Sequence, residues 1–166
     1  MHVTAAHSKR YEEKMIDSLK NTLKSIALAD AILSPEWEYR YFSYNSKWSE
    51  QEEMASMRNG SGGNWFVLFQ TEGRVGYKFI SPEEGFITSL TEIKEKIPEY
   101  YKEFFMEPAF FADQATGIWL LENNEWVKFG LSRSKHLEDL AAVMEWGYKG
   151  YLKWAEEYYE QSINQE

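Results

Sequence analysis

A glycine-rich segment leads directly into an unbroken apolar run near the middle of the chain. Residues 57–69 read Met57-Arg58-Asn59-Gly60-Ser61-Gly62-Gly63-Asn64-Trp65-Phe66-Val67-Leu68-Phe69. Five consecutive apolar residues leave no polar face, which predicts a strand in the centre of a sheet. The glycines before it predict either a tight structural entry into that strand or, with Arg58, the edge of a recognition site.

The region before this segment is predicted to hold a long helix, a strand and a short helix. Apolar residues at spacings of three and four predict one buried stripe on a helix over residues 8–33, which Ser34-Pro35 ends. Aromatic residues alternate with charged ones over residues 37–44, which predicts a strand. Ser49 and Glu52 match a capping box, so a short helix is predicted over residues 49–57.

After the apolar run, turn residues predict two hairpins. Glu72-Gly73 predicts a turn into a return strand over residues 75–79, with Lys78 on the face opposite Tyr77. Residues 116–121 and 126–129 form a second predicted hairpin, in which Asn123-Asn124 makes the turn.

Helices are predicted between and after these hairpins. Helix-start signals occur at residues 81–84 and 89–92, Pro98 predicts a break, and the chain is helical from residue 134 with a break or kink at Gly147 and Gly150. The fold class is therefore α+β, with residues 1–166 as a single domain. We expect a mainly antiparallel sheet of about five strands, packed on one face against the long N-terminal helix and the C-terminal helices.

Composition narrows the possible partners and the compartment. The net charge is −9 and the basic residues are scattered, so no nucleic-acid partner is predicted. No signal-like or membrane-spanning apolar run occurs and cysteine is absent, so a cytoplasmic protein without a membrane association is expected. An acidic surface suits solubility, or a basic protein partner.

No complete catalytic or metal-binding constellation is recognisable in the sequence. The three histidines, His2, His7 and His136, lack metal-site spacing, so no metal, cofactor or catalytic residue is predicted. Ser61 lies in a segment close to a nucleophile elbow, but an elbow follows a strand and opens a helix, whereas here the predicted order is helix, loop, strand. A phosphate-binding loop is excluded by the same order and by the missing Gly-Lys ending. Aromatic doublets at residues 100–101, 104–105 and 110–111 predict core packing, with some rings left to line a groove or interface.

Several motifs together resemble an uncharacterised family of small acidic bacterial proteins. The family pattern M-R-[ND]-G-S-G before an aromatic strand corresponds to residues 57–62, and its E-P-A-F and W-A-x-x-Y-Y-E segments correspond to residues 107–110 and 154–160. Trp119 matches the family's tryptophan-bearing strand. Members often carry an acidic residue where Gly63 stands and a His-Glu pair near the position of Pro82-Glu83, which favours binding over catalysis in this chain. A looser likeness joins it to immunity proteins of bacterial toxin systems, including the SMI1/KNR4-like group.

The predicted function is therefore non-enzymatic protein binding, and the looser likeness implies an immunity protein that neutralises a basic toxin. The alternative is a small-ligand-binding protein or a hydrolase-type enzyme that uses a pocket near Arg58. Protein binding predicts an exposed aromatic patch rimmed by Glu and Asp, whereas the alternative predicts a deep pocket in which Arg58, Trp65 and a carboxylate converge. The candidate ligand- or partner-binding residues are Arg58, Asn59, Ser61, Trp65 and Trp119.

Overall fold

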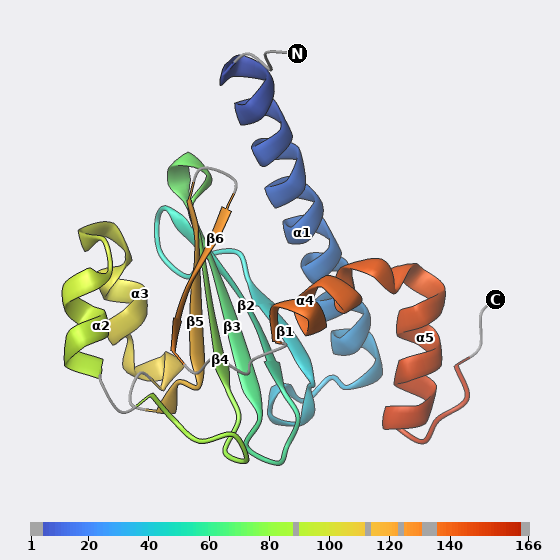
Figure 1. Cartoon of the computed structure of the whole chain (residues 1–166). Coiled ribbons are helices and arrows are strands. Elements are labelled where there is room, and N and C mark those ends of the chain that lie inside the picture. The colour runs from blue at the N-terminus through green and yellow to red at the C-terminus, as the bar shows by residue number, and fades with distance from the viewer. Residues whose placement is uncertain (1–4, 88–89, 112–113, 123–124, 131–135, 164–166) are drawn as a thin grey trace.

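The chain forms one six-stranded antiparallel sheet in which every strand pairs with its neighbour in sequence, in the order β1-β2-β3-β4-β5-β6. A computed structural model describes residues 5–87, 90–111, 114–122, 125–130 and 136–163 (Figure 1). The strands are β1 (Phe42–Asn45), β2 (Glu52–Arg58), β3 (Asn64–Gln70), β4 (Val75–Ile80), β5 (Gly117–Glu122) and β6 (Glu125–Gly130).

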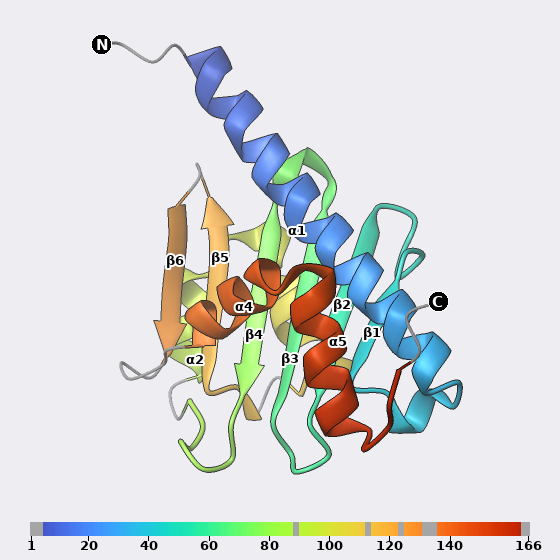
Figure 2. The ribbon, with the colours of Figure 1, turned by 90° about the vertical axis from the view of Figure 1, so that its right-hand side faces the viewer.

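Helices cover both faces of this sheet. On one face lie α1 (Ala5–Leu33), α4 (His136–Glu145) and α5 (Gly147–Tyr158), and on the other lie α2 (Leu90–Lys96) and α3 (Lys102–Met106) (Figures 1 and 2). Four 3-10 helices complete the described elements: η1 (Trp37–Tyr39), η2 (Thr71–Gly73), η3 (Glu99–Tyr101) and η4 (Pro108–Phe110). The α+β class and the single antiparallel sheet are confirmed, but the helices are not confined to one face.

Two separate cores explain this three-layer arrangement. One core joins α1, α4 and α5 to side chains such as Trp65 and Tyr77, and the other joins α2 and α3 to side chains such as Phe66 and Leu68. β3 is buried along its whole apolar run, as the sequence predicts for a central strand. Because that run has no polar face, a layer of helices on each side is the arrangement that removes both of its faces from water.

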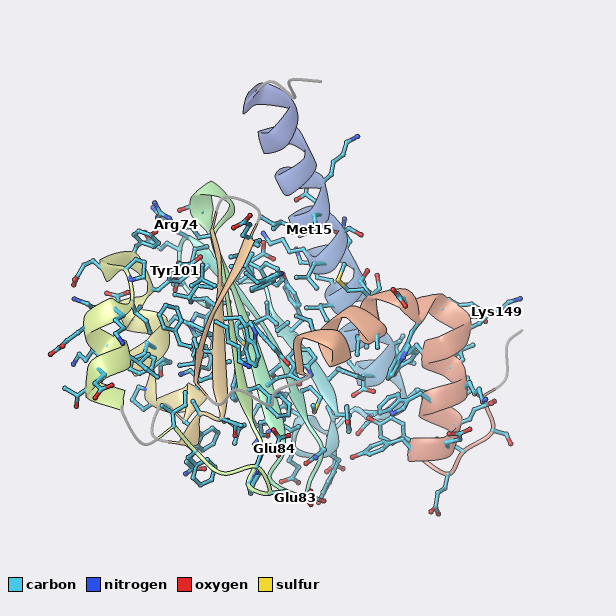
Figure 3. All side chains as sticks on the ribbon, in the orientation of Figure 1. Met15, Arg74, Glu83, Glu84, Tyr101 and Lys149 are labelled. Carbon is cyan, nitrogen blue, oxygen red and sulfur yellow. The ribbon has the colours of Figure 1, made fainter. Side chains whose placement is uncertain are left out.

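The second core also encloses polar groups. Tyr101 of η3 points toward the sheet, and its hydroxyl donates to Val75 O at 3.2 Å and to Leu121 O at 2.9 Å (Figure 3). Lys78 lies on the face opposite Tyr77, as predicted, but it is fully buried. Its Nζ donates to the backbone carbonyls of Phe104 and Phe105, each at 3.2 Å. These bonds attach η3 and α3 to the sheet.

The sequence prediction is wrong for residues 49–57, which form a turn and then β2 rather than a helix. Ser49 Oγ does donate to Glu52 Oε2 at 3.1 Å, but this bond lies in the turn between β1 and β2. β2 pairs with β1 on one side and with β3 on the other. Two ladders of backbone hydrogen bonds override the local helix signal, and this strand raises the count from about five to six.

Three smaller predictions are corrected or refined. The strand predicted over residues 37–44 starts only at Phe42, because residues 37–39 form η1. Residues 82–84 form a turn rather than a helix start. Gly147 has a φ of +56° at the junction of α4 and α5, which confirms the predicted break, whereas Gly150 lies within α5. The Ser89 helix start and the Asn123-Asn124 turn lie outside the described residues.

A buried carboxylate links the elements on the face of the sheet that α1 and α5 cover. Asp30, near the end of α1, is fully buried, and its Oδ2 accepts from Tyr41 N, Phe42 N and the Tyr159 hydroxyl, each at 2.9 Å. Its Oδ1 accepts from the Tyr151 hydroxyl at 2.9 Å. Four donors from β1, α5 and the adjoining residues thus converge on one side chain of α1. Both tyrosine hydroxyls have raised pKa values, because burial and the neighbouring carboxylate disfavour the phenolate.

No described helix is both long enough and apolar enough to cross a membrane.

Candidate functional site

The glycine-rich segment is the loop of the hairpin between β2 and β3, and its polar groups bond to one another. Asn59 Oδ1 accepts from the backbone N–H groups of Ser61 and Gly63, each at 2.9 Å. These two amides therefore already have an acceptor within the loop. A Cβ at Gly63 would lie 2.4 Å from Asn59 Nδ2, so glycine at this position lets the Asn59 side chain fold across the loop.

The loop joins two strands and opens no helix, so the element order that a nucleophile elbow requires is absent. The order is strand, loop, strand rather than the predicted helix, loop, strand. Ser61 is exposed at the tip of the hairpin. Among the described residues, no group of three or more His, Cys, Asp or Glu side chains is arranged to hold a metal ion.

Trp65 and Trp119 are core residues. They are 2% and 3% exposed, and both pack against Tyr77, with ring centroids 6.3 Å and 5.2 Å away. Of the five candidate residues, the structure brings Asn59 and Ser61 together within the loop. Arg58 instead contacts Trp37, which is not one of the five candidates.

Arg58 contacts Trp37 of η1 in two ways. The guanidinium carbon lies 3.9 Å from the centroid of the Trp37 ring, and Nη2 donates to Trp37 O at 3.0 Å. The pKa of Arg58 is lowered by partial burial, which removes water from the guanidinium. A cation over an indole face contributes about 0.5–1 kcal/mol at exposed sites and more where water is displaced.

Trp37 is one of four exposed large apolar side chains at the end of α1 and in η1, and it lines one groove together with Leu28. We call Leu28, Ile32, Trp37 and Tyr39 the Trp37 patch; their side chains are 65%, 71%, 61% and 65% exposed. Leu28 and Ile32 are one helical turn apart and lie off the buried stripe of α1. Sequence reasoning missed this patch because the alternation over residues 37–44 predicted a buried aromatic face. Two apolar residues outside the helical stripe were the available signal.

A groove of about 440 Å³ lies beside this patch, between α1, η1 and β1. Trp37 and Leu28 line it, and Ala27 and Ala31 contribute only small side chains. Its other lining residues are Lys24, Arg40, Ser43, Tyr44 and Ser46. Arg40 is held by the two residues that follow α1, since its Nε donates to Ser34 O at 2.8 Å and its Nη2 donates to Pro35 O.

Several exposed acidic side chains lie at the end of the molecule that holds the Trp37 patch. The topology places the residues before β1, the β2–β3 loop and the residues after β4 at the same end of the sheet. The end of α5 reaches it too, because Tyr158 and Tyr41 rings lie 4.7 Å apart. The exposed carboxylates here are Glu36, Glu38, Glu83, Glu84, Glu157 and Glu160. Figure 3 shows Glu83 and Glu84 at the end of the sheet opposite Arg74.

The chain has no match among protein-family models, curated proteins or solved structures.

Two further cavities lie away from Arg58. One of about 440 Å³ is polar and lies between Glu52, Gln70, Arg74 and Tyr100, and one of about 400 Å³ lies between α1 and α5 beside Tyr148. Neither Arg58 nor Trp65 lines these cavities or the groove beside Trp37.

An ion cluster holds the wall of the groove that Lys24 forms. Glu53 of β2 accepts from Lys20 and Lys24 of α1, each at 2.6 Å, and from the Tyr44 hydroxyl at 2.9 Å. Burial alone would raise the pKa of the Glu53 carboxyl, but these three donors outweigh burial and lower it to about 2. The same burial, together with Glu53, raises the pKa of Tyr44.

We expect Glu53→Gln to lower the free energy of unfolding by about 1–2 kcal/mol at pH 7, since the two lysines are partly exposed and partly screened. A folded pKa of about 2 against an ordinary value of 4.5 means that the stabilisation is complete above pH 4.5 and is lost as the pH falls toward 2. Urea unfolding at pH 7 and pH 3 should therefore show a smaller difference at pH 3. The exposed Glu50→Gln is the control, and an equal loss at both pH values for Glu53→Gln would contradict the assignment.

Proposed function

We propose that this protein binds a basic protein partner through the Trp37 patch. The observation that carries the proposal is the exposure of four large apolar side chains, each more than 60% exposed, at one end of the fold. Contiguous exposed apolar side chains rimmed by polar residues mark interaction surfaces more often than isolated ones do. Tryptophan and tyrosine are also the residues most enriched among those that dominate binding energy.

Charge supports a basic partner. The chain carries a net charge of −9, and six exposed glutamates lie at the end of the molecule that holds the patch. The two arginines beside the patch, Arg40 and Arg58, donate to backbone carbonyls of the protein itself. An acidic rim accelerates association with a basic surface, while the apolar centre supplies most of the affinity.

The same geometry supports protein binding over a ligand pocket at Arg58. The pocket hypothesis needs Arg58, Trp65 and a carboxylate to converge, but Trp65 is buried in the core and Arg58 stacks on Trp37. Together with the likeness to immunity proteins, the surface favours a toxin as the basic partner.

We expect Trp37→Ala to weaken binding of the partner by about 30-fold or more, the effect of losing a dominant anchor of about 2 kcal/mol. The partner is first captured by the full chain, identified and purified, and its affinity is then measured by titration calorimetry. Tyr148→Ala is the matched control, because Tyr148 is another exposed aromatic residue (63%) on α5. Raising the salt concentration should slow association with the wild type.

Two results would reject the proposal: equal affinities for the Trp37 and Tyr148 variants, or an identified partner whose binding surface is acidic. For the toxin proposal, the test is co-expression of the purified partner's gene with this protein. Wild type and Tyr148→Ala should protect the cells, and Trp37→Ala should not. A partner that is harmless when expressed alone would exclude toxin immunity while leaving protein binding in place.

A further inference from the structure

Trp37 stands on a short element that has little internal support. η1 contains three residues, and no side chain caps its start at Glu36. The Trp37 side chain is 61% exposed. A side chain that must be immobilised when a partner binds loses conformational entropy, at a cost of about 0.5–1.5 kcal/mol. A useful anchor in this position therefore needs a contact that orders it beforehand.

Arg58 supplies that contact from the sheet. It is the last residue of β2, its backbone N–H donates to Tyr41 O at 2.8 Å, and it pairs with Asn64 of β3. The backbone that carries the guanidinium is thus fixed by ladders on both sides. The guanidinium in turn holds the Trp37 carbonyl through a hydrogen bond and the Trp37 ring through the stacking contact. One side chain therefore restrains both the backbone and the ring of Trp37.

The Trp37 ring also forms one wall of the groove beside the patch. Leu28 and the small side chains of Ala27 and Ala31 line the same groove, which has a volume of about 440 Å³. Lys24 and Arg40 line it as well. Lys24 is paired with Glu53, and Arg40 donates to Ser34 O and Pro35 O, so both cations already have partners within the chain. The Trp37 ring, Leu28 and the two alanines form the part of the lining that suits an apolar side chain. Basic residues of the partner would instead face the glutamates outside the groove.

We propose that Arg58 is a positioning residue that holds Trp37 as a wall of this groove, and that the groove receives an apolar side chain of the basic partner. The second part rests on the proposed function. The first part concerns the free protein and is tested without a partner.

The first test uses fluorine NMR of the full chain labelled with 5-fluorotryptophan, in which Trp37→Phe identifies the Trp37 signal. Arg58→Met removes the guanidinium and keeps a long apolar side chain. We expect the Trp37 signal to shift and to narrow in this variant, because the ring loses its stacking partner and gains motion. Arg74→Met is the matched control, since the Arg74 guanidinium stacks on Tyr100 at 4.1 Å and lies at the other end of the sheet. An unchanged Trp37 signal in Arg58→Met would overturn the positioning role.

The second test adds indole at millimolar concentration as a small apolar probe. The Trp37 signal should move on addition of indole in the wild type and in Arg74→Met. In Ala31→Phe, whose added ring fills the groove, the Trp37 signal should move much less. Absence of a selective shift in the wild type would overturn the groove as an apolar site, whatever the outcome for Arg58.

The third test measures affinity for the purified basic partner. Arg58→Met should weaken binding about 5- to 10-fold, consistent with the cost of ordering one side chain and its turn. The same change in a Trp37→Ala background should have no further effect, because the residue that Arg58 positions is gone. Equal effects in both backgrounds would show that Arg58 contacts the partner directly and would overturn the positioning role. If Trp37→Ala leaves the affinity unchanged while the fluorine signal responds to Arg58→Met, the proposed function fails and the positioning role stands.

Discussion

Replacing Asp30 with asparagine is expected to lower the free energy of unfolding by about 2–4 kcal/mol, because hydrogen bonds to a charged acceptor contribute about 1.5–3 kcal/mol each and the amide nitrogen cannot accept one. Asparagine keeps the shape of the side chain, but its NH₂ group would face donors where the carboxylate now accepts. Asp30 accepts hydrogen bonds from four groups, which are the backbone N–H groups of Tyr41 and Phe42 and the hydroxyls of Tyr151 and Tyr159.

Urea unfolding at pH 7 measures this loss. Two matched variants separate the contributions of the individual hydrogen bonds. Tyr151→Phe and Tyr159→Phe each remove one donor and leave the carboxylate, so each should cost about 1–2 kcal/mol. In an Asp30→Asn background the same two changes should cost much less, because the acceptor they serve is already altered. A loss below about 1 kcal/mol for Asp30→Asn would show that water or neighbouring groups replace the carboxylate.

Phe104→Ala is the second large expected effect, with a loss of about 3–5 kcal/mol, typical of a fully buried phenylalanine. Phe104 is 1% exposed and packs directly on the backbone of β4. A Cβ at Gly76 would lie 2.6 Å from Phe104 Cδ1, so Gly76 has no side chain where the ring lies. Removing the ring leaves a cavity against that glycine. If the alanine variant does not fold, Phe104→Leu should show the same effect on a smaller scale.

The contact between Gly76 and Phe104 gives this prediction a second readout. Gly76→Ala in the wild type should destabilise by about 1–3 kcal/mol, since the added methyl group overpacks the core. In the Phe104→Ala background the same change should be neutral or stabilising, because the methyl group enters the cavity and alanine is favoured over glycine in a strand. Additive losses from the two changes would contradict this contact.

The sheet was predictable where the sequence signal was local. The run over residues 65–69 has no polar face, and Gly73 takes a φ of +74° in the turn that follows, so the central hairpin could be predicted from neighbouring residues alone. β2 could not be predicted in this way. Its residues, including Glu52 and Glu53, are ordinary helix formers, and only the partners on both sides make them a strand.

The candidate site was likewise predictable only in part. The sequence drew attention to Arg58, but its contact with Trp37 joins residues 21 positions apart and depends on how η1 turns before β1. Trp65 and Trp119 lie in or near the family motifs, which predict a binding role for them, but both side chains are buried in the core. Exposure is a property of the assembled molecule, so the pattern of residues 37–44 alone did not separate the exposed ring of Trp37 from the buried ring of Phe42.

The neighbour-to-neighbour order of the six strands has a consequence for how the chain assembles during synthesis. Each strand can pair as soon as the next strand in sequence has left the ribosome, although β5 must wait until α2 and α3 have also been made. The links to Asp30 are different, because Tyr151 and Tyr159 lie 121 and 129 residues away from it. Until those residues emerge, the apolar face of the sheet that α5 helps to cover stays open to water. α5 is thus added to a sheet whose strands are already paired. Until then, the open apolar face of that sheet exposes the nascent chain to chaperones and to aggregation.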